Sequence, residues 1–212
     1  MVFNLPFNQN REPEISIPEP AAPDAAEVAM LAEFASMWAE ADSLWESNQS
    51  KPAWQGYVSA DYMAVYKSLA ALQGRASTFL EWGSGLGIVT IMASRMGFDA
   101  WGIESESELV DHSKNFAKTY GPKARFGLGS FIPDEFQWNP AEDDLFRTAI
   151  DAASAYGDLD MELRDFDLIY AYPWPDEQGL FKSIVRQFGS SQAILLMYDA
   201  REGMIRDQFT DR

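Results

Sequence analysis

Residues 77–104 read STFLEWGSGLGIVTIMASRMGFDAWGIE, and this stretch decides the fold of the chain. A short apolar run that ends in Glu81 leads into a loop rich in glycine, and a helical pattern begins at Ile88. After that helix the chain enters a second apolar run, which ends in Glu104. The succession of strand, glycine loop, helix and strand predicts the first βαβ unit of a nucleotide-binding sheet.

The spacing within this unit indicates the kind of ligand. Gly83, Gly85 and Gly87 stand where a strand must turn at once into a helix, which requires positive φ or very little side-chain volume. Glu104 lies 17 residues after Gly87, at a strand end where a carboxylate can bind both hydroxyls of a ribose. The third glycine comes one residue earlier than in the dinucleotide pattern G-x-G-x-x-G. Glu81 would also repel a pyrophosphate and attract a cationic ligand.

The pattern E-x-G-x-G-x-G at residues 81–87, with an acid ending the second strand, resembles the class I (Rossmann-like) S-adenosylmethionine-dependent methyltransferases. The resemblance covers roughly residues 54–200 and is nearest in pattern to lysine-directed or uncharacterised bacterial members. It implies an α/β fold with a doubly wound, mostly parallel sheet of strand order 3-2-1-4-5. It also implies S-adenosylmethionine as the cofactor and transfer of a methyl group as the activity.

Composition limits the alternatives. The 212 residues are 47% hydrophobic, which is enough for one domain with a substantial core and an appendage. The chain has no cysteine, so a thiolate metal site is excluded, and its one histidine, His112, is expected on the surface of a helix. We predict no metal site. No apolar run approaches 18 residues and no basic-then-apolar leader is present, which favours a cytoplasmic protein.

The net charge of −17 is unevenly distributed. Residues 1–50 hold nine acids and one base, and residues 131–167 hold eleven acids and two bases. This excess serves solubility or attracts a cationic partner. The chain lacks the basic patch that a phosphate backbone requires, so a nucleic-acid partner is not expected.

The chain divides into three segments. Residues 1–23 carry five prolines and are expected to be an extended or disordered arm. Residues 24–74 form a helical extension, with a first helix capped by Asp24 that runs to about Glu46 and a second capped by Ser59 or Asp61. The aromatic stripe of the first helix serves packing or lines a lid. Residues 75–212 form the Rossmann-like domain.

Three further strands are expected within that domain, at 125–128, 166–171 and 193–198. A capping box of Ser105 and Glu108 starts the helix before the first of these strands, and another helix starts near Asn139 and carries residues up to Tyr156. Only about 14 residues follow the last strand, so the two final strands of the family are apparently absent, and a short helix ends the chain. The strand at 192–198 would then be an open edge, which predicts a homodimer through it or cover by the N-terminal extension.

The resemblance assigns residues to the cofactor. Glu81 and the glycines would enclose the methionine moiety, Glu104 would bind the ribose, and Ser130 and Phe131 would flank the adenine. The segment 56–62 resembles the part of some relatives that folds over the methionine end. The predicted cofactor-binding residues are therefore Tyr57, Ser59, Glu81, Gly83, Ser84, Gly85, Gly87, Glu104, Ser105, Ser130, Phe131 and Ala171.

Catalytic residues are expected in the loop after the fourth strand, Tyr172-Pro173-Trp174-Pro175. In amino-methyltransferases this loop reads Asn/Asp-Pro-Pro-aromatic, whereas Ala171 replaces the polar residue here. Tyr172 and Trp174 can grip an amine by cation–π contact, and Asp176 or Glu177 can accept its proton, although the two aromatic residues can equally be packing.

Two functions therefore stay open. The first is a methyltransferase acting on an amine, either a protein lysine or a small cationic molecule. The second is a non-catalytic S-adenosylmethionine-binding module whose role is interaction. A nicotinamide oxidoreductase is disfavoured by Glu81 and by the glycine spacing.

Overall fold

A computed structural model describes residues 24–137, 148 and 153–209. A six-stranded sheet of order β3-β2-β1-β4-β5-β6 forms its centre, and every neighbouring pair is parallel except β5 and β6. The strands are β1 (Thr78–Trp82), β2 (Asp99–Glu104), β3 (Arg125–Leu128), β4 (Leu168–Ala171), β5 (Ile194–Asp199) and β6 (Gly203–Gln208). The predicted order 3-2-1-4-5 and the doubly wound α/β class are confirmed.

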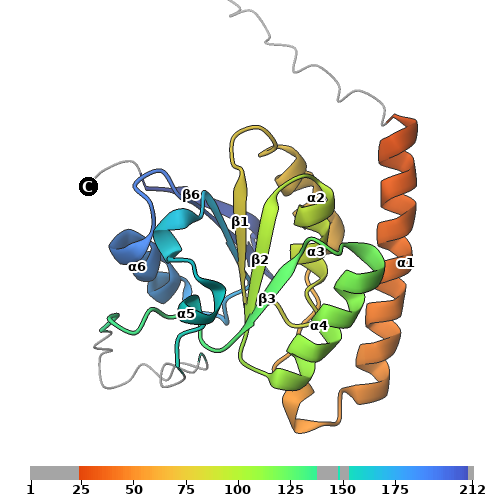
Figure 1. Cartoon of the computed structure of the whole chain (residues 1–212), viewed down its shortest axis with the longest axis horizontal. Coiled ribbons are helices and arrows are strands. Elements are labelled where there is room, and N and C mark those ends of the chain that lie inside the picture. The colour runs from red at the N-terminus through yellow and green to blue at the C-terminus, as the bar shows by residue number, and fades with distance from the viewer. Residues whose placement is uncertain (1–23, 138–147, 149–152, 210–212) are drawn as a thin grey trace, which may run out of the picture.

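Helices cover both faces of the sheet (Figure 1). On one face lie α2, α3 and α4, with α1 packed outside them, and on the other lie α5 and α6. The helices are α1 (Ala25–Asn48), α2 (Tyr62–Ala70), α3 (Ile88–Arg95), α4 (Ser107–Tyr120), α5 (Tyr156–Leu159) and α6 (Gln178–Phe188), with 3₁₀ turns at Pro52–Trp54 and Leu163–Asp165.

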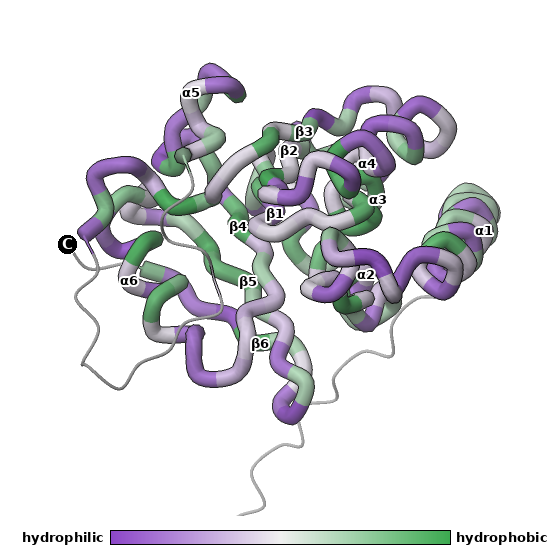
Figure 2. Tube along the Cα trace, turned by 90° about the horizontal axis from the view of Figure 1, so that it is seen from below, coloured by the Kyte–Doolittle hydropathy of each residue, from purple (hydrophilic) through white to green (hydrophobic). Residues whose placement is uncertain are grey.

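The strands alternate between two hydrophobic cores. In β1, Phe79 faces the α3 side and Leu80 faces the α6 side, and both are fully buried. In β4, Tyr170 faces the α3 side and Ala171 faces the α6 side. Strands buried on both faces read as continuous apolar runs, and Figure 2 shows β4 and β5 among the most apolar segments. Because side chains alternate with a period of two, Glu81 must emerge on the α3 side together with Phe79.

The N-terminal helix α1 is a packing element. Asp24 caps it by accepting a hydrogen bond from the Glu27 amide (2.8 Å), as predicted. Its apolar stripe, with Phe34 and Met37 almost fully buried, belongs to the same core as α3 and α4. Polar contacts add to this packing, because the Arg95 guanidinium pairs with Glu33 at 2.6 Å.

The prediction that no strand follows β5 is wrong. Residues Gly203–Gln208 form β6 and pair antiparallel with β5, where a short helix was expected. Half-exposed edge strands carry polar residues and so lack a clear apolar alternation. In β6 only Met204 and Ile205 are apolar. Because β6 occupies the edge of β5, the open edge proposed for a homodimer at 192–198 does not exist.

Smaller corrections concern element starts. The Ser105–Glu108 capping box does not form, because α4 begins after Glu106 and Glu108 instead bonds Lys51 and Trp54. The strand expected at 166–171 begins at Leu168. The arm at 1–23 and most of the helix expected after Asn139 lie outside the described residues, whereas residues 153–155 of that helix are not helical.

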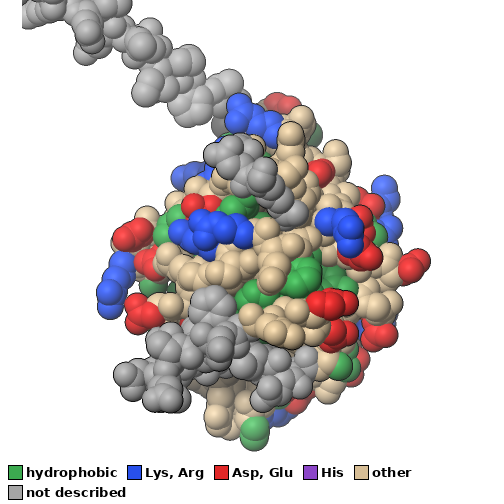
Figure 3. Space-filling model, turned by 90° about the vertical axis from the view of Figure 1, so that its left-hand side faces the viewer, with side chains coloured by type: hydrophobic (Ala, Val, Ile, Leu, Met, Phe, Trp, Pro, Cys, Tyr) green, Lys and Arg blue, Asp and Glu red, His purple; other side chains and the backbone are tan. Residues whose placement is uncertain are grey.

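The face over α6 has mixed charge. Figure 3 shows acidic and basic side chains side by side around an apolar area on this face. One ion pair joins α6 to the edge strand, since the Lys182 ammonium lies 3.0 Å from Asp207. Both side chains of this pair are half-buried, and the packing of α6 rests mainly on its buried apolar residues, which include Leu180, Phe181, Ile184 and Val185.

Asp167 joins the starts of β1 and β4. Its Oδ2 accepts hydrogen bonds from the amides of Ser77 (2.8 Å) and Thr78 (3.1 Å), and its own amide donates to the Thr78 hydroxyl (2.8 Å). We expect Asp167→Ala to lower the free energy of unfolding by about 1–3 kcal/mol, because two strand-end amides lose a charged acceptor. Urea titration measures this change. Asp111→Ala, on the exposed face of α4, is the control, and equal losses in both variants would contradict the role of Asp167.

Candidate functional site

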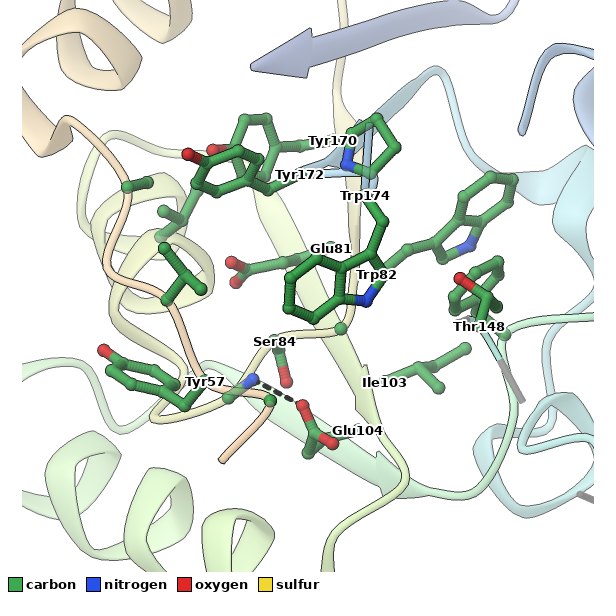
Figure 4. A pocket seen from close by; sticks show the side chains of 18 of the residues that line it. Tyr57, Glu81, Trp82, Ser84, Ile103, Glu104, Thr148, Tyr170, Tyr172 and Trp174 are labelled. Carbon is green, nitrogen blue, oxygen red and sulfur yellow. Dashed lines mark hydrogen bonds between the residues drawn. The ribbon is translucent and has the colours of Figure 1, made fainter. Parts of the chain in front are cut away.

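A cavity of about 970 Å³ opens where the parallel strands end. Its lining comes from the loop between β1 and α3, the end of β2, the segment before α2, the loop after β4 and the turn between β5 and β6. The strand order reverses between β1 and β4, which is the point where α/β sheets bind their ligands. Figure 4 shows Glu81 and Glu104 extending from neighbouring strands into this region.

Glu81 is a buried carboxyl group, with 5% of its surface exposed. Its Oε2 accepts hydrogen bonds from the Thr90 amide (2.8 Å) and the Thr90 hydroxyl (2.5 Å) on α3. Burial raises its pKa to about 8, opposed by the two bonds from Thr90, and the nearby Glu104 raises it further. At neutral pH the group is therefore mostly a neutral acid when no cation is close, a state that the sequence did not indicate.

Glu104 ends β2 on the other side of the glycine loop. Its Oε2 accepts a hydrogen bond from the Gly85 amide (2.8 Å), drawn in Figure 4. Its Oε1 accepts from the Glu106 amide (3.0 Å) and the Ser105 hydroxyl (3.3 Å). Backbone donors thus fix the carboxylate at the cavity wall.

The glycine loop is shaped by close approaches. Gly85 has φ 52°, and a Cβ there would lie 2.6 Å from the ring of Tyr57, which packs on the bare backbone. Gly87 has φ 75° and does not line the cavity. A Cβ on Gly87 would lie 2.5 Å from Phe126, so its lack of a side chain serves the contact with β3.

The structure brings most of the predicted site residues to this cavity. Those that line it are Tyr57, Glu81, Gly83, Ser84, Gly85, Glu104, Ser105, Ser130, Phe131, Tyr172, Trp174 and Asp176. Three others do not. Ser59 is exposed and does not line it, Gly87 packs as described, and Ala171 is fully buried in the core on the α6 side.

Aromatic side chains form much of the wall. Phe131 stacks on Trp82 with ring centroids 4.8 Å apart and an interplanar angle of 15°, so one of its faces is already used in packing. Tyr172 meets Tyr198 edge to face at 5.0 Å. Asp176 has φ 72°, in the left-handed region that residues with a side chain rarely adopt. Such strain is often stored at functional sites.

Glu177 was the alternative to Asp176 as a proton acceptor, and it does not line the cavity. It is 3% exposed and accepts hydrogen bonds from the Thr148 amide (3.2 Å) and the Thr148 hydroxyl (2.6 Å). Its carboxylate therefore holds Thr148, which does line the cavity.

Sequence reasoning missed several lining residues. Tyr62 lies within hydrogen-bond distance of Tyr57, with 3.0 Å between the hydroxyls. Tyr170 pairs in register with Glu81 across β4 and β1, a position that strand alternation could have placed. Residues 200–202 form the turn before β6, which was not predicted; Asp199, at the end of β5, accepts hydrogen bonds from the amides of Arg201 (2.7 Å) and Glu202 (3.0 Å).

Comparison with known proteins identifies the fold. An RNA methyltransferase from Salinibacter ruber in complex with S-adenosyl-L-homocysteine matches 74% of this chain and 95% of its own, with 14% identity and a TM-score of 0.51. A SAM-dependent methyltransferase from Thiobacillus denitrificans, with the same ligand, matches 65% of this chain and 48% of its own (17% identity, TM-score 0.42). A geranyl diphosphate C-methyltransferase from Streptomyces coelicolor matches 64% and 42% (15% identity, TM-score 0.43).

The chain thus spans about half the length of the last two structures. No protein-family model and no curated protein sequence matches it. The chain has the Rossmann-like fold of the Salinibacter ruber methyltransferase. Within the described residues, none of the helices is long and apolar enough to cross a membrane.

The raised pKa of Glu81 predicts a pH-dependent stability. The unfolded carboxyl has a pKa near 4.5 and the folded one about 8, so its stabilising contribution is complete below pH 4.5 and is lost as pH rises toward 8. Between these two pKa values, the free energy of unfolding falls by about 1.4 kcal/mol for each unit of pH. Glu81→Gln cannot ionise, so relative to the wild type its free energy of unfolding should rise steadily from pH 5 to pH 8. Urea titrations at several pH values measure this difference.

Glu46→Gln, on the exposed face of α1, is the matched control and should follow the wild type across the pH range. A Glu81→Gln curve that runs parallel to the wild type would show that Glu81 ionises normally in the folded protein.

Proposed function

We propose that this chain is an S-adenosylmethionine-dependent methyltransferase. The observation that carries the proposal is the joint placement of Glu81 and Glu104, at the ends of adjacent strands, on one cavity beside a glycine loop. The shared fold and the S-adenosyl-L-homocysteine in the neighbouring structures support it.

The residues present fit such a cofactor. Glu104 would accept hydrogen bonds from the ribose hydroxyls, with Ser105 beside it, and Glu81 would receive the amino group. Ser130 and Phe131 at the end of β3 would flank the adenine. Ser84 offers a buried hydroxyl that has no hydrogen-bond partner within the described residues. Buried polar groups are normally paired, so this hydroxyl is available to a ligand.

The acceptor would lie against the loop after β4. Tyr172, Trp174 and Asp176 line that part of the cavity. We infer that the acceptor is an amine, either a protein lysine or a small cationic molecule, because aromatic faces stabilise a cation by about 0.5–2 kcal/mol each. Asp176 would accept the proton that a charged amine must lose before it can attack.

In methyl transfer the main task of the protein is to hold the reacting groups in the correct position. S-adenosylmethionine supplies a methyl group already activated by its sulfonium. Holding nucleophile, carbon and leaving sulfur in line can account for roughly 7–11 kcal/mol of a barrier. A histidine is not required, and the raised pKa of Glu81 suits a group that must become an anion only beside a cation.

One observation favours the second candidate, a non-catalytic cofactor-binding module. Ala171, where amino-methyltransferases keep an acid or amide, is fully buried in the core and offers nothing to an acceptor. If the chain is nevertheless a methyltransferase, only Tyr172, Trp174 and Asp176 are left to bind and deprotonate the acceptor.

Cofactor binding is the first test. We expect S-adenosyl-L-homocysteine to raise the melting temperature and NAD to leave it unchanged, since the glycine spacing departs from the dinucleotide pattern. At a ligand concentration 100 times Kd, stabilisation should be about 2.7 kcal/mol. Glu104→Ala should reduce the shift, whereas Glu108→Ala, outside the cavity, should keep it. No shift with S-adenosyl-L-homocysteine would reject both candidate functions.

Methyl transfer is the second test. Wild-type protein and tritiated S-adenosylmethionine are incubated with cell lysate, with Glu104→Ala as the negative control. For an acceptor found in this way, Trp174→Ala should raise KM about 2- to 30-fold through the lost cation–π contact while the affinity for S-adenosyl-L-homocysteine stays unchanged. If Glu104→Ala labels the lysate as strongly as the wild type does, or if the wild type labels nothing in the lysate, the binding module is favoured.

A further inference from the structure

The hydroxyl of Tyr170 is buried without a partner. Tyr170 lies on β4, is 2% exposed, and its Oη makes no hydrogen bond within the described residues. Leaving a buried hydroxyl unsatisfied costs about 1–3 kcal/mol, so a phenylalanine here would be the more stable choice. The side chain lines the cavity, which indicates that the missing partner is a ligand.

The position of Tyr170 limits what that partner is. It pairs in register with Glu81 on β1, so both side chains leave the sheet on the same face. Figure 4 shows Tyr170, Tyr172 and Glu81 around the same part of the cavity. Burial raises the pKa of Tyr170 well above its usual value of 10, and the nearby Glu81 raises it further, so the group remains a neutral hydroxyl that can donate.

Two other tyrosines, Tyr57 and Tyr62, also line the cavity. Their hydroxyls are 3.0 Å apart, so one donates to the other. Tyr62 is held in place by stacking on Trp38 at 5.7 Å. The cavity therefore holds several neutral tyrosine hydroxyls as well as an acid that can accept.

We propose that Tyr170 donates its hydroxyl hydrogen bond to the carboxylate of an α-amino acid group whose ammonium lies against Glu81. An α-amino acid carries an anion and a cation on one carbon, which matches a donor and an acceptor on neighbouring strands. The inference rests on the proposed function, since S-adenosylmethionine ends in such a group. It makes Tyr170 a residue that distinguishes this end of the ligand from a simple amine.

The test compares two ligands on two proteins by calorimetry. S-adenosylmethionine and its decarboxylated analogue both carry the ammonium and the sulfonium, but only the first has the carboxylate. Wild-type protein should prefer S-adenosylmethionine. Tyr170→Phe should weaken S-adenosylmethionine binding by about tenfold, as expected for one hydrogen bond to a charged group, and leave the analogue unchanged. The four affinities form a thermodynamic cycle, which isolates the contact between the Tyr170 hydroxyl and the carboxylate.

Two further measurements make the result decisive. Tyr66→Phe removes a tyrosine hydroxyl that bonds Glu27 outside the cavity (2.6 Å), and it should change neither affinity. Without ligand, Tyr170→Phe should unfold at the same temperature as the wild type or above it. Equal weakening of both ligands, or of neither, would overturn the role of Tyr170. Failure of wild-type protein to bind either ligand would instead reject the proposed function together with this inference.

Discussion

The burial of Glu81 at the first strand-to-helix turn is the constraint on which the site depends. Strand alternation turns this carboxyl toward α3, where the amide and hydroxyl of Thr90 both bond it. The same turn requires the glycine loop, and that loop places the Gly85 amide against Glu104. One local geometry therefore fixes two acids and a bare backbone around a single cavity, and the remaining elements add walls to it.

The sequence was sufficient for the features that follow from local pattern. The glycine spacing and the apolar runs predicted the βαβ unit, and residues 125–128 formed a strand as expected. Most predicted site residues reached the cavity because they follow the carboxyl ends of parallel strands, which meet at one edge of the sheet. Ser59, Gly87 and Ala171 did not, since resemblance to a motif fixes the order of residues along the chain but not which of them meet the cavity.

Other features depend on contacts that no local pattern records. The strand β6 is stabilised by its pairing with β5, and its polar sequence gives no alternation to detect. Without β6, the turn at 200–202 could not be placed over the cavity. Tyr170 appeared to be one more apolar residue of a buried strand, and only its register with Glu81 places its side chain on the face that lines the cavity. The Ser105–Glu108 box does not form because α4 begins after Glu106, and Glu108 bonds Lys51 and Trp54 instead.

The structure changes the electrostatic basis of ligand choice. Sequence spacing suggested two permanent anions, whereas burial raises the pKa of Glu81 to about 8 and leaves it mostly protonated near neutral pH. A cation beside it lowers that pKa, so binding a cationic ligand below pH 8 expels a proton. A neutral ligand cannot drive this ionisation, and an anion opposes it. Near neutral pH the cavity therefore presents an acid that stays mostly neutral without a cation and ionises beside one, which avoids the cost of a lone buried carboxylate when no cation is bound.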